Sequence, residues 1–178
     1  MENGVTSLQT PAGRSTAAHS SARNLVRCVR EHATSRAGKT AFVHLVDDDP
    51  HETTMTYAEL DRRARAIAAY LQDRGLVGER VVLSYPPGLE FVAAYFGALY
   101  AGCVAVPTCQ PRHRTLDQFR ALAADADAAI ALGTAASIAQ FRAFADRTVT
   151  IPWIATDELV DAEADAGSRM TLRLTRSR

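Results

Sequence analysis

Apolar and polar positions follow two different periods along the chain, and the clearest helical period lies at 57–71. Its apolar positions recur at spacings of three and four residues, as one face of a helix requires. These positions are Tyr57, Leu60, Ala64, Ile67, Ala68 and Leu71. The opposite face is polar and consists of Asp61, Arg62, Arg65 and Gln72. The pattern predicts an amphipathic helix with one buried side.

Both ends of this helix carry local signals. Thr56 stands where an N-cap belongs, and Glu59 follows three residues later. This spacing is that of a capping box, in which each side chain accepts a hydrogen bond from the backbone N–H of the other residue. Gly75 is placed to end the helix, because glycine tolerates the left-handed conformation common after a last helical turn.

Beyond this helix, short apolar runs alternate with longer helical segments. Strands are predicted at 79–85, 103–107, 128–132 and 150–156, and helices at 89–101, 116–126 and 134–145. Thr115 is expected to cap the second of these helices. Such alternation is typical of βαβ units, so the predicted fold class is α/β, with a mainly parallel sheet and flanking helices. The continuous apolar runs at 79–85 and 103–107 predict strands buried on both faces.

The part of the chain before residue 57 predicts a helix and a hairpin. Apolar positions within 22–37 form one helical face, and Gly38 is expected to end that helix. Residues 40–47 and 51–57 have the composition of strands and are separated by a short acidic turn. Two strands joined in this way predict an antiparallel hairpin.

The termini differ in composition from the middle of the chain. Residues 1–20 are small and polar, which predicts a disordered arm. Residues 161–178 are first acidic and then basic, and we expect them to form a disordered tail. The remaining range, 21–160, is therefore the predicted ordered unit.

Composition and charge narrow the function classes. The chain has 178 residues, of which 47% are hydrophobic, and it carries 20 basic and 20 acidic residues. A net charge of zero argues against nucleic-acid binding through a basic face. No apolar signal segment begins the chain, and the most apolar stretch, 89–106, is interrupted by Glu90 and two glycines. We therefore expect no membrane span and a cytoplasmic location. The three cysteines form no C-x-x-C pair, which argues against a disulfide framework or a zinc site.

The residues alone predict no catalytic, cofactor-binding or metal-binding group. Gly97 and Gly102 have the glycine spacing of a phosphate loop, but Cys103 and Val104 follow where that loop needs lysine and a hydroxyl residue. Neither G-x-G-x-x-G nor G-x-S-x-G occurs, and no histidine pair has metal-ligand spacing.

One cationic loop, formed by Arg112, His113 and Arg114, follows a predicted strand. Ligands of α/β proteins often contact the carboxyl ends of strands, so these three residues are candidate ligand contacts. A solvated loop without a ligand is the alternative, and the sequence favours it.

Two segments together resemble a known family. The stretch MTYAELDRRARAIAAYLQDRG, at 55–75, is similar to the first core motif of the adenylate-forming superfamily, and GLEFVAAYFGALYAGCVAVPT, at 88–108, resembles its second. Further stretches, QPRHRTLDQFRALAADADAAIAL and IPWIATDEL, look like fatty-acyl-AMP ligases in particular. The matching motif residues are Thr56, Tyr57, Glu59, Leu60, Gly102 and Pro107. The resemblance implies structural roles for them.

The resemblance implies a fold and a chemistry. The fold would be the first part of the family's large N-terminal domain. Full-length members use ATP and Mg²⁺ to convert a fatty acid into an acyl adenylate, and cationic groups offset charge on the leaving pyrophosphate. The acyl group then passes to a thiol of coenzyme A or of an acyl-carrier protein.

The chain departs from the family pattern after the last matching stretch. The family's Ser/Thr- and Gly-rich phosphate loop should follow IPWIATDEL, but the final residues, SRMTLRLTRSR, do not resemble it. Lys39 lies in a predicted N-terminal turn and does not replace the family's catalytic lysine. The sequence therefore predicts a truncated N-terminal fragment of a fatty-acyl-AMP ligase that is inactive alone. Two alternatives stay open: an acyl-binding or regulatory module that pairs with a separately encoded chain completing the fold, and a small enzyme with unrecognised chemistry.

Overall fold

The computed structural model of the protein describes residues 24–45, 52–145 and 151–159. The predicted arm at 1–20, the predicted tail at 161–178 and the acidic turn of the predicted hairpin lie outside the described residues.

The centre of the fold is a parallel sheet of four strands in the order β4-β3-β5-β6. The strands are β3 (Arg80–Ser84), β4 (Val104–Thr108), β5 (Ala128–Gly133) and β6 (Trp153–Ala155). All three neighbouring pairs run parallel. The predicted α/β class and parallel sheet are therefore confirmed, and the helices between successive strands provide the crossovers that parallel pairing needs.

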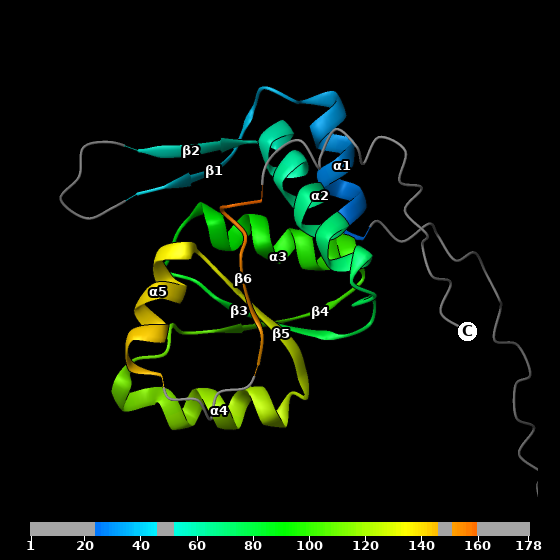
Figure 1. Ribbon diagram of the computed structural model, residues 1–178. Coiled ribbons are helices and arrows are strands. Elements are labelled where there is room, and N and C mark those ends of the chain that lie inside the picture. The colour runs from blue at the N-terminus through cyan, green and yellow to red at the C-terminus, as the bar shows by residue number, and fades with distance from the viewer. Residues whose placement is uncertain (1–23, 46–51, 146–150, 160–178) are drawn as a thin grey trace, which may run out of the picture.

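Helices cover both faces of the sheet (Figure 1). The helices are α1 (Leu25–Ser35), α2 (Tyr57–Asp73), α3 (Leu89–Ala101), α4 (Leu116–Asp125) and α5 (Ala135–Phe144). Val81 and Leu83 belong to the core under α2 and α3, whereas Val82 belongs to the core under α4 and α5. Successive strand residues point to opposite faces, so a single apolar run supplies both cores.

An antiparallel hairpin of β1 (Thr40–His44) and β2 (Thr53–Thr56) packs beside α2. The hairpin prediction is confirmed, but the second strand is shorter than predicted. The backbone N–H of Thr56 donates to Glu59 at 2.8 Å, and the Thr56 hydroxyl accepts from the N–H of Glu59 at 3.2 Å. This capping box begins α2 at Tyr57, so Tyr57 is helical.

The bounds of α3 are those predicted from the sequence, and the helix lies between the sheet and α2 (Figure 1). It ends at Gly102, whose φ of 77° is left-handed. The N–H of Cys103 donates to the carbonyl of Ala98 at 2.9 Å, and that of Gly102 to Leu99 at 3.1 Å. These two bonds form a Schellman motif, which is the reason a glycine is needed here.

Two further predictions were wrong in detail. The strand at 103–107 was expected to be buried, but β4 is an edge strand of the described sheet and Val104 is 52% exposed. Pro107 is tolerated there because an edge strand has one row of N–H groups without ladder partners. Thr115 precedes α4 but makes no side-chain cap to it. Its hydroxyl instead accepts from the N–H of Arg112 at 2.9 Å.

None of the helices in the described ranges is long and apolar enough to cross a membrane.

Candidate ligand-binding site

The carboxyl ends of the parallel strands meet at one edge of the sheet, where α/β folds place ligands. The chain leaves β3 through Pro86 and Pro87, and it leaves β4 through the loop that contains Arg112. A short 3-10 turn, His113–Thr115, then leads into α4. The candidate cationic loop therefore stands at the sheet edge that the sequence predicted.

An apolar cavity of about 960 Å³ opens between the end of β3, the loop after β4 and α4. Its lining includes Tyr85, Phe91, Pro107, Arg112, Phe119 and Leu122. Aromatic and aliphatic side chains make most of this wall, and Arg112 is its cation. A cavity of this composition suits an apolar ligand that carries one polar or anionic end.

Tyr85 lines this cavity and is also hydrogen-bonded to Thr156, which follows β6. Its hydroxyl lies 2.8 Å from Oγ1 of Thr156, and both residues are buried. Burial raises the pKa of Tyr85 well above its ordinary value, so the phenol stays protonated. Because β3 and β6 do not pair with each other, this bond links strand ends that the sheet ladder leaves apart.

A second, smaller cavity of about 250 Å³ lies beside the first, between the end of β3, the loop after β4 and α5. Gln110, Arg112 and His113 contribute to it from the loop, and Ser84 and Trp153 from the sheet. Arg112 and His113, two of the three candidate contacts, thus line the same cavity. Arg114 is exposed and lines neither of these two cavities.

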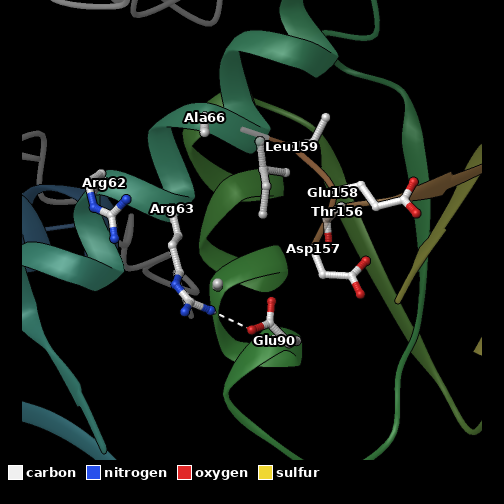
Figure 2. A pocket seen from close by; sticks show the side chains of 10 residues that line it. Arg62, Arg63, Ala66, Glu90, Thr156, Asp157, Glu158 and Leu159 are labelled. Atoms are coloured by element: carbon white, nitrogen blue, oxygen red, sulfur yellow. Dashed lines mark hydrogen bonds and ion pairs between the residues drawn. The ribbon is translucent and has the colours of Figure 1, made fainter. Parts of the chain in front are cut away.

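A third cavity, of about 380 Å³, is lined by residues of α2, of α3 and of the segment after β6 (Figure 2). Arg63 on α2 forms an ion pair with Glu90 on α3. Asp157 instead accepts a hydrogen bond from the N–H of Ala135 at 2.9 Å, at the first turn of α5. These two contacts link neighbouring elements. The Arg63–Glu90 ion pair is partly exposed, so its contribution to stability is small.

The motif residues have structural positions. Thr56 and Glu59 form the capping box, Leu60 is fully buried, and the ring of Tyr57 packs against His32 with centroids 4.9 Å apart. Gly102 ends α3, and Pro107 lies in β4 on the wall of the apolar cavity.

Sequence reasoning missed Ser84, Tyr85 and Trp153. A weak signal existed for the first two: polar groups directly follow the apolar run of β3, where the strand reaches the carboxyl edge. Trp153 carried no such signal, because its neighbours across the sheet come from distant parts of the chain.

Within 24–45, 52–145 and 151–159, no group of three His, Cys, Asp or Glu side chains could hold a metal ion. Lys39 lies in the turn between α1 and β1, where its N–H donates to the carbonyl of Arg36.

Comparison with known proteins places the fold. The pattern of AMP-binding enzymes matches residues 29–172, most of the chain. The chain belongs to the AMP-binding enzyme family. Within this family it is 36% identical over 135 residues to the medium-chain-fatty-acid–[acyl-carrier-protein] ligase JamA of Moorena producens, and that alignment covers 71% of this chain. It is 35% identical over 99 residues, 54% of this chain, to the long-chain-fatty-acid–AMP ligase FadD26 of Mycobacterium marinum.

A solved structure of the same family agrees. The fatty acyl-adenylate ligase from L. pneumophila, in complex with acyl adenylate and pyrophosphate, superposes with a TM-score of 0.73 and 35% identity over 81% of this chain. The chain spans only part of each AMP-binding relative: 23% of JamA, 17% of FadD26 and 25% of the L. pneumophila ligase. The match is to the N-terminal part of fatty-acyl-AMP ligases.

Proposed function

We propose that the protein serves in the activation of a fatty acid as its acyl adenylate. In the proposed reaction, a fatty-acid carboxylate attacks the α-phosphate of ATP and pyrophosphate leaves. A thiol of an acyl-carrier protein or of coenzyme A then loses its proton and attacks the acyl carbonyl, so that a thioester forms and AMP leaves. The observation that carries the proposal is the agreement, at 35% identity and a TM-score of 0.73, with a fatty acyl-adenylate ligase. The resemblance to two fatty-acid ligases over 99 and 135 residues supports the same substrate class.

The chain's own part in this reaction is to form a frame and an apolar wall. The cavity lined by Phe91, Phe119 and Leu122 offers a surface that suits an alkyl chain. The described residues supply no metal cluster, and the sequence has no glycine-rich phosphate loop. We therefore propose that adenylation needs the remaining part of a full-length ligase in addition to these 178 residues, and that these residues are inactive alone.

An ATP–pyrophosphate exchange assay tests this proposal. The chain is assayed alone and together with a polypeptide that supplies the remaining ligase part, in each case with medium-chain and long-chain fatty acids. We expect exchange only when the remaining ligase part is present and a fatty acid is supplied. Acetate and amino acids serve as control substrates, and exchange that prefers them would contradict the fatty-acid assignment. Rapid exchange by the 178 residues alone would contradict the proposal that they need the remaining part of a ligase.

A second function is favoured by the apolar cavity itself. A volume of about 960 Å³ exceeds that needed for a small metabolite and suits an acyl chain. The chain would then be an acyl-binding or regulatory module that pairs with a separately encoded ligase part, in the cytoplasm. Both edges of the described sheet, β4 and β6, offer backbone groups for such a pairing.

Fatty-acid binding to the isolated chain separates the two functions. Calorimetric titration with a medium-chain fatty acid gives measurable heat if the module binds acyl chains by itself. Replacing Leu122 by Asp places a charge on the cavity wall and abolishes that binding, whereas Leu25→Asp, at an exposed position on α1, leaves it unchanged. Because burying an alkyl chain can have almost no enthalpy near 25 °C, the titration is repeated at a second temperature, and no heat at either one would contradict the stand-alone acyl-binding function.

A further inference from the structure

The strand β6 lies at one edge of the described sheet and turns a row of backbone groups away from it. The carbonyl of Pro152 accepts from the N–H of Ala131 at 2.9 Å, and the N–H of Thr156 donates into β5 at 3.0 Å. In a parallel ladder, residues that bond to one neighbouring strand alternate with residues whose N–H and C=O face the other way. Trp153 and Ala155 therefore turn both of these groups outward, where no described strand lies.

The side chains of β6 reach both cores but are incompletely covered. The ring of Trp153 packs against Phe119 and Phe141, with centroids 5.4 and 4.6 Å apart, and Ile154 packs against the core under α2 and α3. All three residues of β6 are half-buried, whereas the last four residues of β5 are buried. Apolar surface thus remains beside β6 on both faces of the sheet, and one more strand would bury it.

The β6 edge also lacks the features by which natural sheets prevent pairing with another strand. Such features are charged side chains, prolines and bulges. The stretch 151–156, IPWIAT, contains no charge, and its pairing with β5 shows no register shift. Its one proline, Pro152, has its carbonyl bonded to β5. An edge of this kind is a template for the addition of a strand.

The opposite edge, β4, is better protected. The N–H of Val104 donates at 2.9 Å to the carbonyl that precedes β3, so Cys103, Ala105 and Pro107 are the residues turned outward. The N–H of Cys103 is already bonded within the end of α3, and proline has no N–H. Within 103–107, Ala105 is therefore the one residue left with an outward N–H. This comparison makes β6 the more open edge.

From this geometry we propose that β6 is the docking edge for an apolar strand of the remaining ligase part, which pairs with the outward groups of Trp153 and Ala155. The inference rests on the proposed function, in which these residues work together with the rest of a ligase. The chain spans 25% of the L. pneumophila ligase and 23% of JamA, so most of such a protein is available to supply the strand. Cores on both faces require the added strand to be apolar at successive positions.

Hydrogen exchange of single backbone amides tests the pairing without ATP or fatty acid. The full chain is measured alone and joined by a flexible linker to the part of JamA that follows the matched region. We expect the amides of Trp153 and Ala155 to exchange at least about tenfold more slowly in the joined protein, because a ladder hydrogen bond protects them. The amide of Ala105, on the β4 edge, is the comparison and should slow less.

Three results of this experiment would overturn the proposal. They are no slowing of Trp153 and Ala155 in the joined protein, equal or greater slowing at Ala105, and full protection of both β6 amides in the chain alone. The last result would mean that a second copy or another segment of this chain occupies the edge. Fatty-acid-dependent ATP–pyrophosphate exchange by a joined protein with unprotected β6 amides would refute the docking edge but keep the proposed function. Protected amides without that activity would do the reverse.

Variants of the joined protein show that the protection arises at β6. Ala155→Pro removes one outward N–H and leaves the bonds of Pro152 and Thr156 to β5, so the slowing at Trp153 should fall at least about tenfold. Ala105→Pro, at the outward position of β4, is the matched control and should keep the slowing. Ala155→Lys is a second variant, which retains the N–H but places a charge beside the added strand. Undiminished slowing at Trp153 in both Ala155 variants, with circular dichroism showing that the fold is kept, would sink the assignment.

Discussion

Gly97 of α3 lies so close to Ile67 of α2 that a Cβ atom built on the glycine would stand 2.6 Å from both Cβ and Cγ2 of Ile67. Real Cβ atoms essentially never approach other atoms within 3.0 Å. The absence of a side chain at this position therefore sets the distance between the two helices. The glycine spacing that superficially resembles a phosphate loop has a packing explanation at Gly97 and a helix-ending explanation at Gly102.

Replacing Gly97 by Ala is the first prediction. The added methyl group must displace Ile67, and such overpacking costs about 1–3 kcal/mol, which exceeds the gain of up to about 1 kcal/mol in helix propensity. We expect a net loss of about 1–2 kcal/mol in the free energy of unfolding, measured by urea denaturation followed by circular dichroism. Gly38→Ala is the matched control, since a Cβ there meets nothing within 4 Å. Equal stability of the two variants would contradict the packing argument.

The capping box gives a second prediction. Thr56→Ala removes the acceptor for the N–H of Glu59 and should lower the free energy of unfolding by about 1 kcal/mol. Thr54→Ala, at an exposed position in the same strand, should change it by less than about 0.5 kcal/mol. Thermal and urea denaturation measure both variants. A Thr54 effect as large as that of Thr56 would show that strand propensity, not capping, is responsible.

The same box makes stability depend on pH. The backbone N–H of Thr56, and then its hydroxyl, donate to the Glu59 carboxylate and lower its pKa below the ordinary 4.5. The folded state thus holds this proton more weakly than the unfolded state. The resulting stabilisation is present above the ordinary pKa and is lost as the pH falls through the lowered one.

Glu59→Gln tests this dependence, because the amide can still accept a hydrogen bond but does not titrate in this range. The stability advantage of the unchanged chain over Glu59→Gln should be larger at about pH 6 than at about pH 3. Urea denaturation at the two pH values gives the comparison. An advantage that stays constant or grows on acidification would reverse the sign of the argument.

The buried pair of Tyr85 and Thr156 gives a fourth prediction. Tyr85→Phe keeps the ring but leaves the Thr156 hydroxyl buried without this partner, so we expect a loss of about 1–2 kcal/mol in the free energy of unfolding. Thr156→Val removes the other partner. A double-mutant cycle should then give a coupling energy of about 1 kcal/mol between the two positions. Strictly additive losses would indicate that the bond contributes nothing.

Thiol reactivity gives a fifth prediction. Burial raises the pKa of Cys103 to about 11, and its Sγ donates to the carbonyl of Leu76 at 3.1 Å. At pH 8 roughly one part in a thousand of this thiol is therefore ionised, and the thiolate is the reactive form. Cys109 is exposed and should react first with a disulfide reagent such as Ellman's reagent. The fast phase should vanish in Cys109→Ser, and its persistence there would refute the assignment.

Most elements could be predicted because their causes are local. The residues of α3 form an apolar helix that ends at a glycine, and the Thr56–Glu59 pair begins α2. The end of α3 and the start of α2 therefore follow from residues that are neighbours along the chain. The candidate site could be predicted only in part. Arg112 and His113 were named as candidates because they follow a predicted strand, whereas Ser84 and Trp153 were not named because their shared cavity depends on which strands become neighbours.

The sequence by itself determined the α/β alternation, the start of α2, the end of α3 and the family, because periodicity, capping and motif residues are properties of neighbouring positions. Only the tertiary structure decided that β4 lies at an edge, that Gly97 admits no side chain, and that Ser84, Trp153 and Arg112 converge on one cavity. Those features depend on contacts between distant segments. The order of the strands in the sheet depends on how the whole apolar surface is buried. No short stretch of residues specifies that order.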